Sequence, residues 1–282
     1  MDLIKNLRDK TGAGISECKQ ALEGARGDIK KAIEILRKKG IARAAKRGGR
    51  EAREGVIKVM VNDAGDEGYI VEVNAETDFA ARSDKFQDFS NKVLETVKTG
   101  KPASVEELMS MKLDRGTVKD NLDNLSGVIG EKLDIKRCAV LTGETVAGYS
   151  HMGGKIGVLV ALNKPGEIEL AREIAMQVAA ANPQYIKPED VPQEEIDKEK
   201  EIYAEQLKKK GKPQFGKASK SFSAKVMADK PENIIEKILA GKINKYFEEI
   251  CLIKQEYIKD DKKRVEDVLG DVKVEKFIRH SL

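Results

Sequence analysis

Few residues in this sequence have the chemistry that most enzyme active sites use. The 282 residues include two histidines, His151 and His280, and three cysteines, which lie more than a hundred residues apart. Such wide spacing forms no paired cysteine motif, so it argues against both a zinc site and a disulfide framework. Any acid–base chemistry would therefore depend mainly on carboxylates and lysines.

Two glycine-rich segments are candidates for phosphate-binding loops. They are TGAG at residues 11–14 and GGKIG at residues 153–157. Neither has the spacing of a Walker loop or of a dinucleotide-binding fingerprint, so we interpret both as turns, where glycine supplies a positive φ. His151 lies just before the second segment, and no Ser or Cys nucleophile signature accompanies it. We expect a protein that is not an enzyme and that needs no metal or cofactor.

Phe79 is the residue best suited to recognition. It lies between Asp78 and Ala80, in a short polar stretch before a predicted helix. An aromatic side chain beside a charge is typical of the anchor residues of protein interfaces. Because most phenylalanines are core residues, periodicity alone favours the alternative, in which Phe79 covers the start of its helix.

The first forty residues predict three short amphipathic helices, with the third ending at Gly40. A bundle of this size buries too little apolar surface to support chemistry, so we expect residues 1–40 to form a docking module. Residues 41–54 are basic and rich in alanine and glycine. They predict a helical or flexible linker.

Two similar α+β halves follow, residues 55–142 and 143–191. In each half, a hairpin of alternating apolar residues precedes a short polar stretch and an amphipathic helix. The alternating segment VKVEKFIRH near the end of the chain predicts a last strand that completes the sheet of the second half, so residues 251–282 belong with it. The expected fold class is α+β with antiparallel sheets.

Residues 192–250 predict an antiparallel helical arm with a lysine-rich stretch at about 208–230 near its tip. This stretch has eight lysines and one acidic residue, whereas the whole chain has a net charge of +4. The rest of the chain is therefore mildly acidic, which weakens a nucleic-acid-binding role for the whole fold. No apolar run approaches the length of a membrane span or a signal peptide, and we expect a cytoplasmic protein.

Five segments of the sequence, in this order and spacing, resemble the bacterial elongation factor Ts family: RDKTGAGISECKQAL, NAETDFAAR, VIGEKLDIKR, GYSHMGGKIGVLV and KFIR. The resemblance implies an N-terminal three-helix UBA-like domain, a core of two α+β subdomains and a coiled-coil arm. It also implies a partner, the GTPase elongation factor Tu, and a role in releasing the GDP bound to that partner.

The resemblance also assigns roles to single residues. Thr77, Asp78 and Phe79, followed by Ala80, match a segment that the family inserts beside a helix of the GTPase near its Mg²⁺ site. This reverses the preference for a buried Phe79. A family valine is replaced here by Ala80, which we expect to trim the apolar contact of the wedge.

Further positions match family contacts with the GTPase. Ile129, Gly130 and His151 match contacts of the core, whereas Arg8 and Lys19 match contacts of the docking domain. The alternatives are that Ile129 is a core residue and that Lys19 is merely solvated.

The lysine-rich stretch, with Phe215 and Phe222, resembles an insertion in the arm of the family. We hypothesise that it makes a secondary contact with RNA phosphates. The competing function is that of an RNA-binding or ribosome-associated protein that acts through this stretch. Such a protein is expected to spread its positive charge over a folded face, and not to confine it to one arm.

Overall fold

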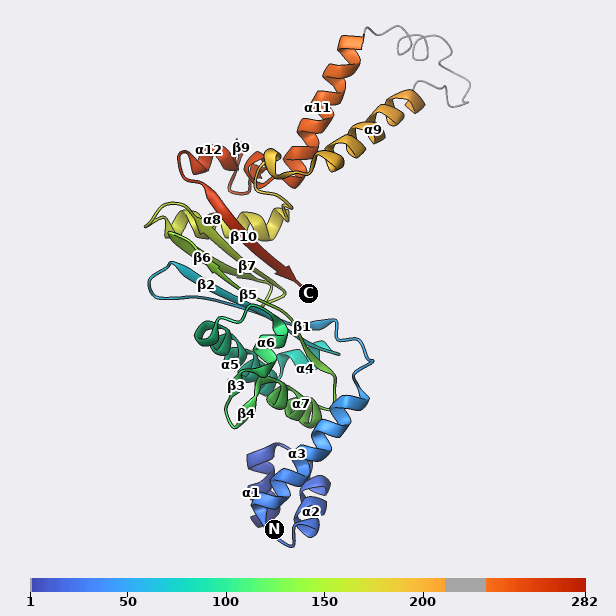
Figure 1. The fold of residues 1–282 in the computed structure, drawn as a ribbon, viewed down its shortest axis with the longest axis vertical. Coiled ribbons are helices and arrows are strands. Elements are labelled where there is room, and N and C mark those ends of the chain that lie inside the picture. Colours follow the sequence, from blue (N-terminus) through green and yellow to red (C-terminus); the bar gives the residue numbers. More distant parts are fainter. Residues whose placement is uncertain (1, 211–231) are drawn as a thin grey trace. The chain divides into compact units, whose positions relative to one another are not determined.

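The structure, a computed structural model, describes residues 2–210 and 232–282. The chain divides into two compact units, Met1–Ala179 with Lys273–Leu282, and Ala180–Val272 (Figure 1). The lysine-rich stretch expected at about 208–230 lies almost entirely outside the described residues. The fold is α+β with antiparallel sheets, as the sequence predicts.

Three helices open the first unit: α1 (Asp2–Thr11), α2 (Ile15–Gly24) and α3 (Ile29–Lys46). Leu7, Cys18 and Ala32 form the centre of their small core and are fully buried. The prediction that the third helix ends at Gly40 is wrong, because α3 continues to Lys46. Gly40 instead lies at the crossing of α3 with a helix of the core.

The first sheet consists of β1 (Glu54–Val61), β2 (Glu67–Ala75) and β5 (Leu133–Thr142), in the order β1-β2-β5. Side chains of the central strand alternate between two apolar clusters. Val71 and Val73 face the helices of the first half, whereas Ile70 packs in the cluster shared with the second sheet. The period-two pattern of the sequence therefore placed this strand correctly.

Helices cover the outer face of the first sheet. The amphipathic helix α5 (Asp84–Gly100) buries Phe86, Val93 and Val97 in the cluster that contains Val71 and Val73. The remaining elements of this half are α4 (Asp78–Arg82), α6 (Val105–Ser110), β3 (Lys112–Leu113), β4 (Gly116–Thr117) and α7 (Val118–Ile129).

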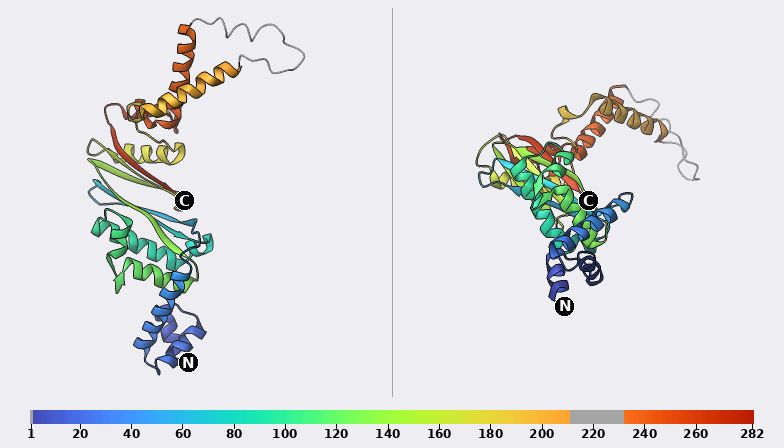
Figure 2. Two further views of the ribbon diagram at one scale, coloured as in Figure 1. Left: turned by 45° about the vertical axis from the view of Figure 1, so that its right-hand side comes forward. Right: turned by 60° about the horizontal axis from the view of Figure 1, so that its bottom comes forward.

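The second sheet consists of β6 (Thr145–His151), β7 (Ile156–Leu162) and β10 (Val274–Ser281), in the order β10-β7-β6. The predicted return of the last strand is thus confirmed. Residues 158–162 of the central strand are buried on both of its faces. One face packs on the first sheet, and α8 (Ile168–Ala181) lies on the other side of the second sheet (Figure 2).

The second unit contains the helices α9 (Gln193–Lys210) and α11 (Glu232–Ile250), which form the predicted arm. Ile196, Tyr246 and Ile250 share one cluster where the two helices meet. The other elements of this unit are η1 (Pro188–Asp190), η2 (Leu252–Lys254), β8 (Glu256–Tyr257), β9 (Asp260–Arg264) and α12 (Val265–Leu269).

Candidate interface around Phe79

Phe79 is exposed to solvent at the start of α4. Its exposed fraction of 83% is the highest among the large hydrophobic side chains that the structure describes, so the core alternative for this residue is wrong. Ala80 and Ala81, by contrast, are buried in the cluster beneath α4. The short helix therefore presents the aromatic ring to solvent and its alanines to the core.

The burial of Ala80 changes the meaning of the substitution noted in the sequence. Only 6% of Ala80 is exposed, and its side chain packs in the protein's own core. The expectation that alanine at this position trims an exposed apolar contact does not fit this placement. Alanine at this position is therefore part of the packing beneath α4.

Thr77 caps α4 and is itself held by a carboxylate. Its hydroxyl oxygen accepts a hydrogen bond from the N–H of Ala80 at 3.2 Å. The same hydroxyl donates to Oε1 of Glu131 at 2.7 Å, and the N–H of Thr77 donates to Oε2 of Glu131 at 3.0 Å. Both oxygens of one carboxylate thus hold the residue from which the helix starts.

A second carboxylate makes the reverse connection between the same two loops. Oε1 of Glu76 accepts a hydrogen bond from the N–H of Lys132 at 2.5 Å, and the guanidinium of Arg50 lies 3.2 Å from it. The N–H of Lys132, together with Arg50, holds the pKa of Glu76 below its ordinary value. This carboxylate is therefore charged at neutral pH and binds the loop that carries Glu131.

Gly130 ends α7 in the left-handed conformation, with a φ of +92°, and its N–H donates to the carbonyl of Ser126. Glycine adopts this φ without strain, so the chain can turn directly from the helix toward Glu131. The hydroxyl of Ser126 donates to the carbonyl of Glu131 at 2.6 Å. Ile129 is half-buried and packs against the core, while Gly130 is exposed.

His151 lies at the end of β6, in the turn that leads to β7. The ring of Tyr149 stacks on it at a centroid distance of 5.9 Å, and the tyrosine hydroxyl lies 3.0 Å from its Nδ1. Met152 follows with a φ of +51° and an exposed fraction of 67%. The turn therefore presents an aromatic pair and a thioether side chain to solvent.

The turn after His151 is attached to the same edge of the first sheet as the Phe79 segment. The carbonyl of Gly154 accepts from the N–H of Ile57, and Lys155 pairs with Glu54 at 3.4 Å. Glu54 in turn is the register partner of Ala75, two residues before Thr77. The structure thus joins residues 77–80 to the loop after Gly130 through Glu131, and it attaches the turn after His151 to β1, the strand that pairs with the end of β2.

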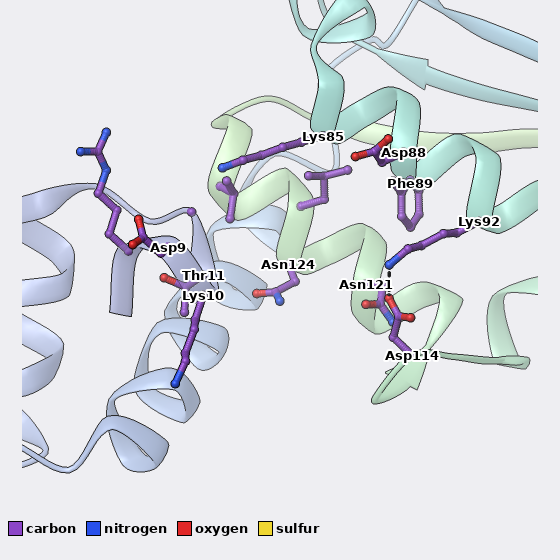
Figure 3. Close-up of a pocket in the computed structure, with 14 residues that line it drawn as sticks. Asp9, Lys10, Thr11, Lys85, Asp88, Phe89, Lys92, Asp114, Asn121 and Asn124 are labelled. Atoms are coloured by element: carbon purple, nitrogen blue, oxygen red, sulfur yellow. Dashed lines mark hydrogen bonds and ion pairs between the residues drawn. The ribbon is translucent and has the colours of Figure 1, made fainter. Parts of the chain in front are cut away.

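The two residues predicted in the docking module lie on different faces of it. Lys19 is exposed beside Leu3 and Leu22, along a shallow groove of the bundle. Arg8 lines a cleft of about 590 Å³ between α1 and the helices α5 and α7. In this cleft, Lys85 extends toward the turn after α1, and Lys92 pairs with Asp114 at 2.7 Å (Figure 3).

The described part of the chain has neither a metal-binding cluster nor a membrane-spanning helix. Among residues 2–210 and 232–282, no group of three or more His, Cys, Asp or Glu side chains is arranged to hold a metal ion. Within the same described part of the chain, no helix has the length and hydropathy of a membrane span. The exposed Phe79 and its two supporting loops therefore form the best-defined candidate site.

The chain is similar to known proteins along nearly its whole length. The family model described as "Elongation factor TS" matches residues 76–282, which begin within the segment that supports Phe79. The chain belongs to the elongation factor Ts family. It is 43% identical to an elongation factor Ts of Chlorobium phaeobacteroides over 99% of this chain and 96% of that protein.

Two further relatives match nearly the whole of this chain and about nine-tenths of their own length. An elongation factor Ts of Nitratiruptor is 42% identical over 99% of this chain and 91% of its own length. One of Clostridium perfringens is 39% identical over 98% of this chain and 90% of its own length. Membership of the elongation factor Ts family makes this chain a translation elongation factor.

Sequence reasoning missed the residues that support Phe79 in this member of the family: Glu131, Glu76, Lys132 and Arg50. One signal was available in the sequence. A capping box needs a Glu or Gln at the third helical position to accept from the N–H of the capping residue, but here that position is Ala80. The N–H of Thr77 therefore required an acceptor from elsewhere, and Glu131 supplies it.

Proposed function

We propose that this chain is a guanine-nucleotide exchange factor for elongation factor Tu, acting in the cytoplasm during translation elongation. The observation that carries the proposal is the exposed ring of Phe79, held on a capped helix beside two further candidate contact segments. Burying such a ring against a partner is worth on the order of 2 kcal/mol. The chain itself makes and breaks no bond, so the proposed activity is not enzymatic.

The proposed mechanism is thermodynamic coupling. A protein that binds the nucleotide-free GTPase more tightly than the GDP-bound form must weaken GDP binding by the same factor. In the family, the matching segment acts beside a helix of the GTPase near its Mg²⁺ site. Displacing the ligands of Mg²⁺ leaves the charge of the GDP phosphates poorly compensated, so GDP dissociates.

The other predicted residues fit the same partner. Ile129, Gly130 and His151 would extend the contact around Phe79, because their segments are attached to the same edge of the sheet. Lys19 would act in a separate contact of the helical bundle, and Arg8 would act at the cleft beside it. On this proposal, substitutions in the bundle weaken binding, whereas substitution of Phe79 slows the release step.

The test is a displacement assay. Elongation factor Tu loaded with fluorescent GDP is mixed with the full chain and an excess of unlabelled GDP, at several Mg²⁺ concentrations. We expect wild type to accelerate release and Phe79→Ala to lower the maximal rate by roughly tenfold. Raising the Mg²⁺ concentration should reduce the acceleration by wild type.

A matched control is Ile168→Ala, which removes another exposed large hydrophobic side chain, 53% exposed, in the same unit. It should leave the maximal rate unchanged. Since Phe79 is exposed, Phe79→Ala should also keep the thermal unfolding midpoint of wild type. If wild type gives no acceleration, the exchange function is wrong, and salt-dependent RNA binding through the lysine-rich stretch becomes the function to test.

A further inference from the structure

We propose that Glu131 is a positioning residue for Phe79, and that it couples the Ile129–Gly130 contact to the release step. This inference rests on the proposed exchange function. Glu131 would act without touching the partner, by fixing the N-terminus of the helix that presents the ring.

The helix that carries Phe79 is too short to hold itself. α4 spans five residues, Asp78–Arg82, and a single turn of helix is unstable without support at its ends. The ring belongs to the second residue after the cap, so any movement of Thr77 moves it directly. Glu131 restricts this movement through two hydrogen bonds, at 2.7 Å to the hydroxyl and 3.0 Å to the N–H of Thr77.

Glu131 is itself held in place. The hydroxyl of Ser126 donates to its carbonyl at 2.6 Å, and the following residue, Lys132, donates its N–H to Glu76. The ammonium of Lys132 also donates to the carbonyl of Arg50 at 2.9 Å. Each loop therefore uses a carboxylate to bind a backbone N–H of the other loop, and the two loops are expected to move together.

The same geometry argues that the effect of Glu131 is indirect. Both of its carboxylate oxygens are engaged by Thr77, and its side chain is half-buried. The two hydrogen bonds orient this carboxylate toward the start of α4. A change at Glu131 should therefore act only through the position of Phe79, and its effect should disappear when the ring is absent.

The experiment combines four variants of the full chain with the displacement assay. Glu131→Ala removes both acceptors, Glu131→Gln keeps an amide oxygen that can accept from Thr77, and Phe79→Ala is tested alone and together with Glu131→Ala. The control is Glu107→Ala, which removes a carboxylate that accepts from the N–H of Ala103 at 2.7 Å beside α6, away from Phe79. Maximal release rate and half-saturating concentration are measured separately.

We expect Glu131→Ala to lower the maximal rate on the order of tenfold, with a smaller change in the half-saturating concentration. Glu131→Gln should stay within roughly threefold of wild type. The double variant should be no slower than Phe79→Ala alone, because the two substitutions remove the same interaction with the partner. Glu107→Ala should behave as wild type.

A second readout needs no partner. Amide hydrogen exchange of residues 78–82 in the free chain should be faster in Glu131→Ala than in wild type, while the amides of α5 keep their protection. This separates local loosening of α4 from a general loss of stability.

Three results would overturn the inference: unchanged exchange kinetics in Glu131→Ala, a double variant whose loss is the product of the two single losses, or unchanged amide protection of α4. The second would make Glu131 a direct contact. If wild type itself fails to accelerate GDP release, the exchange function fails first and the inference falls with it.

Discussion

Gly127 in α7 lies directly against the backbone of Gly40 in α3. A Cβ atom on Gly127 would lie 2.7 Å from the Cα of Gly40, closer than real Cβ contacts allow. A Cβ atom on Gly40, in contrast, would lie 3.8 Å from the Cα of Gly127, an ordinary contact distance. Polar contacts flank the crossing, with Arg37 paired to Asp120 at 3.2 Å. The packing of the helical bundle against the core therefore requires glycine at position 127 and not at position 40.

Gly127→Ala should weaken this attachment. Alanine normally stabilises a helix interior by up to about 1 kcal/mol relative to glycine, but overpacking at a backbone contact costs about 1–3 kcal/mol. We expect faster hydrogen exchange and proteolysis in α1–α3, and a higher half-saturating concentration in the displacement assay. The maximal release rate should change less than in Glu131→Ala, because the hydrogen bonds between Glu131 and Thr77 are kept.

Two alanine substitutions serve as controls for Gly127→Ala. Gly40→Ala adds a methyl group at an ordinary contact distance, and Gly241→Ala adds one in open space on α11. Both should be neutral or slightly stabilising in thermal unfolding. Equal protection of the bundle in Gly127→Ala and Gly40→Ala would contradict the steric argument.

Local patterns predicted most of the elements, because their causes are local. The alternation of Ile57, Val59 and Val61 predicts a strand, and the stripe from Phe86 to Val97 predicts α5; both are present. The end of α3 was mispredicted for a tertiary reason. Glycine at position 40 looks like a helix end in sequence, whereas in the fold it lies inside α3 and its backbone packs against Gly127 of α7.

The candidate site was predictable only in part. The resemblance found Phe79 and its neighbours, but the carboxylate that holds Thr77 is 54 residues away in sequence. No periodicity connects two positions at such a separation. The burial of Ala80 also depends on which side of α4 packs on the core, and a five-residue helix is too short for an amphipathic pattern to show it.

His280 should make stability depend on pH. It is buried on β10, near Arg137 of β5 and the buried Glu72 of β2, with Lys136 also paired to Glu72 at 3.9 Å. Burial, with a smaller effect of Arg137, lowers the pKa of His280 from 6.5 to about 4. Between these values the unfolded chain binds a proton that the folded chain does not, so stability is complete above pH 6.5 and decreases toward pH 4.

His280 contributes at most about 3 kcal/mol to the pH dependence of the free energy of unfolding. This contribution is measured by comparing wild type with a variant that lacks the histidine. Urea unfolding of wild type and His280→Leu is followed from pH 4 to 8. The free energy of unfolding of wild type minus that of His280→Leu should rise between about pH 4 and pH 6.5 and stay constant at higher pH. His151→Gln removes an exposed histidine as a control, and a pH-independent difference for His280→Leu would refute the prediction.

Glu195 should stabilise the second unit through two tyrosines. Its carboxylate accepts hydrogen bonds from the hydroxyls of Tyr246 and of Tyr185, the latter at 2.7 Å. These bonds, that of Tyr246 first, hold the pKa of Glu195 below its ordinary value. Glu195→Ala should therefore lower the unfolding midpoint. The loss should be largest at neutral pH and should shrink as the pH falls far enough to protonate the wild-type carboxylate.

The neighbouring Glu194 provides the control for this substitution, because its side chain is exposed. Glu194→Ala should leave the unfolding midpoint unchanged. Tyrosine fluorescence is a suitable signal, since the chain has six tyrosines and no tryptophan. Equal midpoints for Glu195→Ala and Glu194→Ala at pH 7 would show that the tyrosine contacts contribute nothing measurable.

The three cysteines should differ in their reactivity toward a thiol reagent. Cys18 and Cys251 are fully buried, whereas Cys138 is half-buried on β5. Burial, with Asp190 and Glu189 nearby, raises the pKa of Cys251 to about 11, and burial also raises the pKa of Cys138. The thiolate is the reactive form of cysteine. A thiol reagent at pH 7.5 should therefore modify one thiol of the folded chain slowly and all three thiols of the unfolded chain. Cys138→Ser should abolish the reaction of the folded chain, whereas Cys18→Ser should not. Rapid modification of more than one thiol in the folded chain would contradict this order of burial.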